Sequence, residues 1–146
     1  MRDESEMSAS RLAARNAAVL LLIGLATGGL VSAAMTGRVD AEPGAALASH
    51  LNALLGAFWV LGVGWSLQFL RYGPVGQRRL VWATTVPNVA NWAVTAFKAF
   101  WKVKGIDAVG EVKNDTIFGL LTALVVLPAL GAAAAWVYGF KRAQGP

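Results

Sequence analysis

The sequence contains no cysteine and a single histidine, His50, among its 146 residues. Disulfide bonds are therefore excluded, and one chain cannot supply the His and Cys ligands of an ordinary four-ligand zinc site. Charged residues are also scarce, at 14% of the chain, against about 25% in an average soluble domain. The long apolar runs contain no Asp or Glu. Proton-coupled transporters and pumps generally need such an intramembrane carboxylate, so its absence argues against transport.

Apolar residues, by contrast, make up 56% of the chain. They form long runs, each near or above the ~20 residues that cross the hydrocarbon core of a bilayer. The runs cover residues 17–35, 45–70, 80–101 and 116–140. We therefore predict an all-α integral membrane protein, with one four-helix transmembrane bundle at residues 17–140. Residues 1–16 would form a polar lead-in, frayed or interfacial, and residues 141–146 a short tail.

The formal net charge is +5, which in a soluble chain would suggest nucleic acid as a partner. Here the basic residues flank the apolar runs, where they set orientation, so we expect membrane lipid and no nucleic acid around the protein. One side would carry Arg2, Arg11, Arg15, Arg71, Arg78, Arg79, Lys141 and Arg142; the other would carry Arg38, Lys102, Lys104 and Lys113, diluted by acids. This asymmetry predicts a multi-pass protein of a bacterial-type inner (plasma) membrane with both termini in the cytoplasm.

His50 lies near the start of the second apolar run, where a histidine is costly unless something binds it. A metal that brings its own equatorial ligands, as haem iron does, needs only one protein ligand. The alternative is a structural histidine that donates to a backbone carbonyl and packs against a neighbour. The residues around His50 are small, which leaves room for a flat cofactor or for another helix. They are Ser49, Ala53, Gly56 and Ala57.

Polar residues recur along the third run at spacings of four, three, four and three. They are Thr84, Asn88, Asn91, Thr95 and Lys98. This period places them on one helix face, which should point into the bundle or a cavity because polar groups in hydrocarbon need partners. Pro87 lies within the stripe and frees the carbonyl of Ala83, which predicts a kink. Two interpretations stay open: a substrate site, and a polar seam that joins helices.

Two stretches of the chain resemble a known family. Ser49-His50-Leu51 and the segment from Asn88 to Thr95, with Ala90-Asn91-Trp92 at its centre, are similar to the small membrane isomerases that comprise hydroxylaminobenzene mutase and styrene oxide isomerase. The resemblance covers residues 49–140 and includes the four-helix layout. The styrene oxide isomerase branch implies a trimer with haem b at its subunit interfaces and the second-helix histidine as axial ligand. His50 would then bind the iron.

The resemblance also implies the chemistry of the site. A small apolar aromatic substrate would enter from the bilayer, and the iron would act as a Lewis acid on its oxygen. No second His or Cys exists in the chain to fill the opposite face of the iron. Asn91, with Asn52 or Asn88, would hydrogen-bond the substrate oxygen. Trp92 and Phe97 would wall the aromatic ring, and Trp92 would also contact the cofactor.

Two departures from the family pattern affect the choice of substrate. The family has an asparagine six residues after the histidine, where this chain has Gly56. The epoxide isomerases have a tyrosine at the position of Thr95, whereas the mutase-like members have threonine there. Thr95 therefore favours conversion of an arylhydroxylamine to an aminophenol. Isomerisation of an aryl epoxide, styrene oxide to phenylacetaldehyde, is the alternative.

A homo-oligomer is expected because four short helices offer little interior for a cofactor as large as haem. Small residues at four-residue spacing, Gly24 and Gly28 early in the chain and Gly131, Ala135 and Gly139 late in it, offer close contact surfaces. Closed cyclic symmetry is the usual form of such contacts, and a trimer is implied only by the resemblance. A non-enzymatic haem-binding or assembly subunit is the competing hypothesis.

Overall fold

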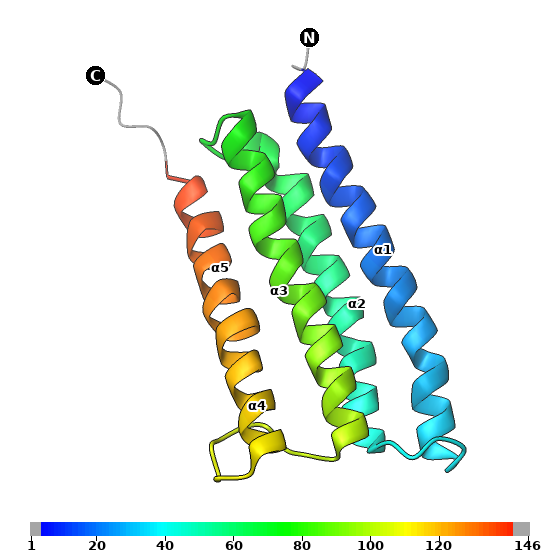
Figure 1. Ribbon diagram of the computed structural model, residues 1–146. Coiled ribbons are helices and arrows are strands. Elements are labelled where there is room, and N and C mark those ends of the chain that lie inside the picture. Colours follow the sequence, from blue (N-terminus) through cyan, green and yellow to red (C-terminus); the bar gives the residue numbers. More distant parts are fainter. Residues whose placement is uncertain (1–3, 142–146) are drawn as a thin grey trace.

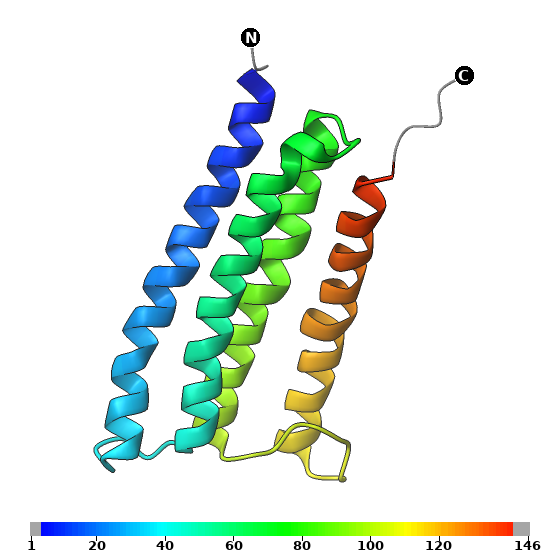
Figure 2. The same cartoon turned by 180° about the vertical axis from the view of Figure 1, so that it is seen from behind.

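The structure, a computed structural model, describes residues 4–141 as four long helical rods that lie side by side (Figures 1 and 2). The all-α prediction is confirmed, with no strand among the described residues. The first three rods are α1 (Glu4–Met35), α2 (Pro43–Ser66) with the 3-10 turn η1 (Leu67–Phe69), and α3 (Pro74–Trp101). The fourth rod joins α4 (Val112–Leu120), the π-helical η2 (Leu121–Val126) and α5 (Leu127–Gly139).

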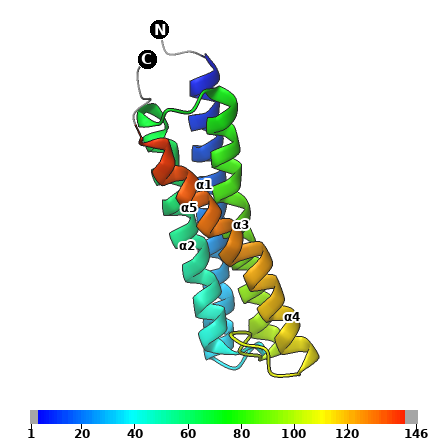
Figure 3. The same cartoon turned by 90° about the vertical axis from the view of Figure 1, so that its left-hand side faces the viewer.

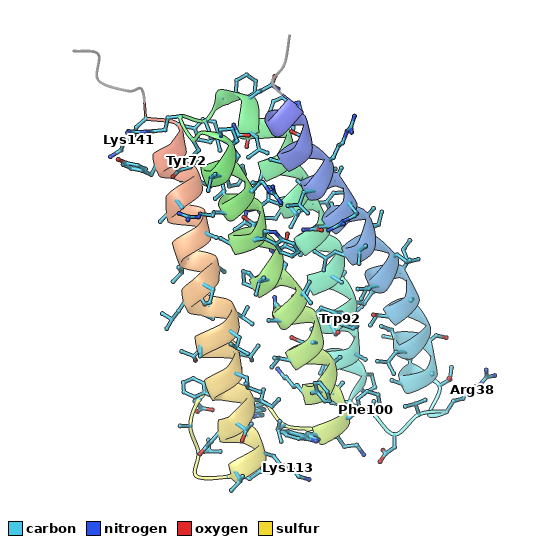
Figure 4. All side chains as sticks on the ribbon, turned by 45° about the horizontal axis from the view of Figure 1, so that its top comes forward. Arg38, Tyr72, Trp92, Phe100, Lys113 and Lys141 are labelled. Atoms are coloured by element: carbon cyan, nitrogen blue, oxygen red, sulfur yellow. The ribbon has the colours of Figure 1, made fainter. Side chains whose placement is uncertain are left out.

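The rods alternate in direction, so the start of α1 and the end of α5 lie at the same end of the bundle, here called the terminal end (Figure 1). The loops after α1 and after α3 lie at the opposite end (Figure 2). Figure 4 marks the two ends with labelled side chains: Tyr72 and Lys141 at the terminal end, and Arg38 and Lys113 at the opposite end. This arrangement places both described ends of the chain on one side of the bundle, and which side faces the cytoplasm stays a prediction.

α1 begins at Glu4 rather than at residue 17, so most of the expected lead-in is part of the first helix. Ala9 and Ala13 are fully buried at helical spacing. Ala13 lies close to α2: a Cβ added at Gly64 of α2 would be 2.6 Å from the Cβ of Ala13. Tight packing therefore explains why this segment is ordered despite its charges. Residues 1–3 of the lead-in and 142–146 of the tail lie outside the described residues.

Prolines and a carboxylate set the helix starts. Pro43 and Pro74 open α2 and α3, where a missing N–H costs nothing, and Glu42 caps α2 by accepting from the backbone N–H groups of Gly44 and Ala45 at 2.9 and 2.6 Å. α3 continues through Pro87 as one helix. In the fourth rod the π-helical turn ends two residues before Pro128, whose ring would clash with a carbonyl one turn earlier in a regular helix.

The interior combines alanines and polar residues, which are common between membrane helices, with leucine and valine side chains. α2 packs along α1 and α3, whereas the fourth rod packs mainly on α3 and passes in front of α2 and α3 in Figure 3. One apolar cluster lies toward the terminal end and includes Leu20, Val60 and Val81. A second cluster near the opposite end is centred on Ala46 and Ala99. The polar residues between these clusters form the candidate site.

Three stretches are long and apolar enough to cross a membrane by length and composition: Ala9–Met35, Pro43–Phe69 and Val112–Gly139. α3 is not among them because its polar stripe and its arginines lower its hydropathy. It runs alongside α2 along the bundle (Figure 1), so a membrane that contains α2 also contains α3. Only 17% of the most apolar window of the fourth rod is buried within the chain. Such exposure is typical of a surface covered by lipid or by another subunit.

Candidate functional site

His50 is half-buried on α2 and faces α1. Its Nδ1 lies 2.7 Å from the carbonyl oxygen of Gly24. Because a carbonyl can only accept, Nδ1 is the ring nitrogen that donates, which leaves Nε2 as the nitrogen able to meet another partner. Nε2 has no hydrogen-bond partner among the described residues. A carbonyl contact at one nitrogen is expected of a structural histidine, but the free second nitrogen is the arrangement of a metal ligand oriented by its surroundings.

Glycines on α1 allow this contact. A Cβ added at Gly24 would lie 2.7 Å from Leu54 Cδ2 and 3.2 Å from Ala53 Cβ on α2. A Cβ at Gly28 would lie 3.5 Å from His50 Cε1, an ordinary contact. The small-residue surface expected on the first helix therefore packs against α2 of the same chain. Gly24 and Gly28 therefore do not support the contact between subunits that we expected from their spacing.

Three other predicted residues form a hydrogen-bonded group, which we call the amide cluster: Asn52 of α2 with Asn91 and Thr95 of α3. Asn52 Nδ2 donates to Asn91 Oδ1 and to Thr95 Oγ1, both at 3.1 Å, and Thr95 Oγ1 lies 3.3 Å from Asn91 Oδ1. Asn52 and Asn91 are half-buried, and Thr95 is buried. No described residue bonds Asn91 Nδ2 or Asn52 Oδ1. The amide cluster thus keeps the Asn91 NH2 group as a donor and the Asn52 carbonyl oxygen as an acceptor for a ligand.

Asn88 lies outside the amide cluster. It is buried and donates through Nδ2 to the carbonyl of Thr84 at 2.8 Å, within its own helix. Its side chain fills the space beside Gly56, where an added Cβ would lie 2.7 Å from Asn88 Oδ1. Thr84 likewise donates to the carbonyl of Leu80 at 2.9 Å. Thr84 and Asn88 therefore form a packing seam between α2 and α3. The side-chain hydrogen bonds from the stripe to another helix come from Asn91 and Thr95.

Trp92 connects α3 to α1. Its Nε1 donates to Thr27 Oγ1 at 2.9 Å, and that hydroxyl donates in turn to the carbonyl of Ile23 at 2.7 Å. Ser49 of α2, fully buried, donates to the carbonyl of Trp92 at 2.9 Å. Trp92 lies on α3 between the ends marked by Tyr72 and Phe100 (Figure 4). Sequence reasoning missed Thr27, because a lone threonine in an apolar run normally bonds only its own helix.

The structure does not place His50 and the amide cluster on the same side of α2. His50 and Asn52 are two residues apart, which separates their directions by about 200° around a helix of 3.6 residues per turn. His50 accordingly contacts α1, whereas Asn52 contacts α3. Within one chain, the predicted metal ligand and the predicted oxygen-binding amides therefore face different neighbours.

The donor set fits one kind of metal centre. The described residues contain no group of three or more His, Cys, Asp or Glu side chains that could hold a bare ion. A single imidazole with a free Nε2 suits a metal that brings its other ligands, as haem iron does. Trp92 donates a hydrogen bond to α1, the helix that His50 also contacts. Contact between Trp92 and a cofactor at His50 stays a prediction.

A separate apolar groove of about 780 Å³ lies between α3 and α5. Its walls include Trp82, Val86 and Pro87 from α3, with Pro128 and Gly131 from α5. No residue of α1 or α2 lines it. This groove is therefore distinct from both His50 and the amide cluster.

In a comparison with protein families, the sequence model of the family described as styrene oxide isomerase matches residues 9–143. The match covers three rods in full, α1 from Ala9 onward, and every candidate residue named above. No curated protein and no solved structure is significantly similar to the chain. The match confirms the family resemblance that begins at Ser49-His50-Leu51.

Proposed function

Because the chain belongs to the styrene oxide isomerase family, we propose that it is a membrane isomerase that rearranges small aromatic epoxides with the help of haem b bound at His50. The observation that carries this proposal is the state of His50: Nδ1 is held by the Gly24 carbonyl, and Nε2 is free. The family match moves the preferred substrate from arylhydroxylamines, which Thr95 favoured, to aryl epoxides.

His50 would hold the iron through Nε2, and the Gly24 carbonyl would fix the ring. Haem iron bound there supplies a Lewis acid for the substrate oxygen. The apolar runs offer no carboxylic acid that could protonate an epoxide instead. The rearrangement itself needs no second reactant. The benzylic C–O bond breaks, a hydrogen moves with its electron pair to the benzylic carbon, and the carbonyl of the aldehyde forms.

The amide cluster would bind the substrate oxygen. Asn91 Nδ2 has no partner among the described residues, while Asn52 and Thr95 hold the Oδ1 side of the same amide. Such a fixed donor in a site of low dielectric stabilises negative charge as it develops on oxygen. Asn88 is not needed for this role, because its amide is bonded to its own helix.

We further propose that the complete site forms between subunits of a homo-oligomer, with a trimer as the number that the family resemblance implies. His50 and the amide cluster point about 200° apart around α2, so one substrate can reach both if they come from neighbouring chains. The exposed apolar side of the fourth rod is a candidate surface for contact with a neighbour or with lipid. We also propose that the protein lies in a bacterial-type inner membrane with both termini in the cytoplasm. Arg11, Arg15, Arg71, Arg78 and Arg79 would lie on the cytoplasmic side with the termini.

The test is product analysis with purified protein in detergent, supplied with haem b. Styrene oxide should give phenylacetaldehyde, and no aminophenol should form from phenylhydroxylamine. The reverse result would support the second candidate, a hydroxylaminobenzene mutase, which is favoured by Thr95 in place of a tyrosine. Turnover of neither substrate by haem-loaded protein would support a non-enzymatic haem-binding subunit.

A further inference from the structure

Arginines gather around one tryptophan at the terminal end of the bundle. A hollow of about 370 Å³ is lined by Arg11, Leu12 and Arg15 of α1 and by Arg78 and Trp82 of α3. A second hollow of about 380 Å³ shares Arg78 and Trp82 with the first and adds Arg79. Both are of a size that accepts a small ligand. We call the two hollows together the arginine pocket.

The helices hold this pocket in place. Immediately below Arg15, Asn16 donates to Thr85 Oγ1 of α3 at 3.2 Å, and both side chains are buried. On the α2 side, Ala13 is in close contact with Gly64. These contacts fix α1 against α2 and α3 just where the arginines project. The helix segments that carry the exposed arginines are therefore held at fixed positions relative to one another.

The charges in the pocket are of one sign. Arg11 and Arg15 are one helical turn apart, a spacing at which like charges repel. Asp40, Glu42, Asp107, Glu111 and Asp115, the acids whose side chains are described, form no ion pair with the pocket arginines. The ion pair found among these residues joins Lys102 to Asp40 at the opposite end. An anion between the guanidinium groups would relieve this repulsion and could bind them in bidentate fashion.

The position of the pocket identifies the kind of anion. Arg11 and Arg15 lie near the start of the apolar span Ala9–Met35, and Trp82 is partly exposed beside them, as tryptophans at membrane interfaces are. Phosphate groups of lipids occupy this depth, and basic pockets between membrane helices bind them. We propose that the arginine pocket binds the phosphate of a glycerophospholipid with net negative charge, such as phosphatidylglycerol.

The test is native mass spectrometry of the delipidated full chain, titrated with phosphatidylglycerol and separately with phosphatidylcholine. The wild type should retain phosphatidylglycerol in preference. In Arg11→Gln/Arg78→Gln, the concentration that gives half saturation should rise about 30-fold, since each basic residue near the lipid contributes about a factor of five. The matched control is Arg38→Gln/Lys104→Gln, which removes the same charge at the opposite end and should leave the titration unchanged. Circular dichroism should show equal helicity in all three proteins.

Three results would overturn the proposal. The first is equal retention of the two lipids by the wild type. The second is an equal loss of phosphatidylglycerol binding in both double variants, which would show that binding depends on the net charge of the protein and not on the arginine pocket. The third is displacement of the lipid by an equal concentration of glycerol phosphate, which would make a free phosphate ester the ligand. Failure of glycerol phosphate to compete, together with loss confined to the pocket variant, would support binding of the intact lipid.

Discussion

The contact between Gly24 and α2 orients the only imidazole of the chain, so its perturbation can be predicted in detail. In Gly24→Ala, the new methyl would lie 2.7 Å from Leu54 Cδ2 and 3.2 Å from Ala53 Cβ. The Leu54 methyl can turn away, but Ala53 has no side-chain freedom, so α1 must shift by a few tenths of an ångström. Overpacking of this kind costs about 1–3 kcal/mol of unfolding free energy.

The matched control lies in the same helix. Gly29 has nothing within 4 Å of an added Cβ, so Gly29→Ala gains helix propensity without a clash. The gain from replacing Gly by Ala, about 1 kcal/mol in a helix interior, is common to both variants. The difference between them should therefore equal the overpacking cost alone.

The measurement is equilibrium unfolding in mixed detergent micelles, followed by circular dichroism. Gly24→Ala should be less stable than Gly29→Ala by about 1–3 kcal/mol. Its affinity for haem should also fall, because the Gly24 carbonyl moves away from His50 Nδ1. If Gly24→Ala proves as stable as Gly29→Ala, the close approach of α1 to α2 described above is incorrect.

Three further predictions concern the site. Asn91→Ala should lower kcat for styrene oxide by about 10²–10³-fold at unchanged haem content, and an unchanged kcat would remove Asn91 from the reaction. Mixed oligomers of His50→Ala and Asn91→Ala subunits should regain activity that each variant lacks alone, because one interface would then combine an intact His50 with an intact amide cluster; no recovery would contradict a site between subunits. Trp92→Phe and Thr27→Val should each cost about 0.5–1.5 kcal/mol, with the double variant costing no more than either, as a double-mutant cycle in unfolding free energy would show.

The helical bundle was predictable because its signals are local. Long apolar runs and a polar stripe with helical period define where most helices lie and which face of α3 is buried. The early start of α1 was missed because its charges suggested an exposed tail. The buried side chains of that segment, Ala9, Ala13 and Asn16, are small or polar and give a weak hydropathy signal although they do follow helical spacing.

The candidate residues of the site could be named from the sequence, but their hydrogen-bond partners could not. Asn52, Asn88, Asn91 and Thr95 were all candidates, yet only the tertiary arrangement decides that Asn88 bonds its own helix while the other three meet. The direction of His50 depends on which helix offers a close carbonyl. Gly24 supplies it, and the glycine spacing alone does not identify α2 as its neighbour.

An absorption spectrum of detergent-purified protein after addition of haem b tests the role of His50 most directly. The wild type and Asn91→Ala should both show a strong Soret band, and His50→Ala should lose it together with turnover of styrene oxide. A Soret band of equal strength in His50→Ala, or no band in the wild type, would contradict haem ligation by His50.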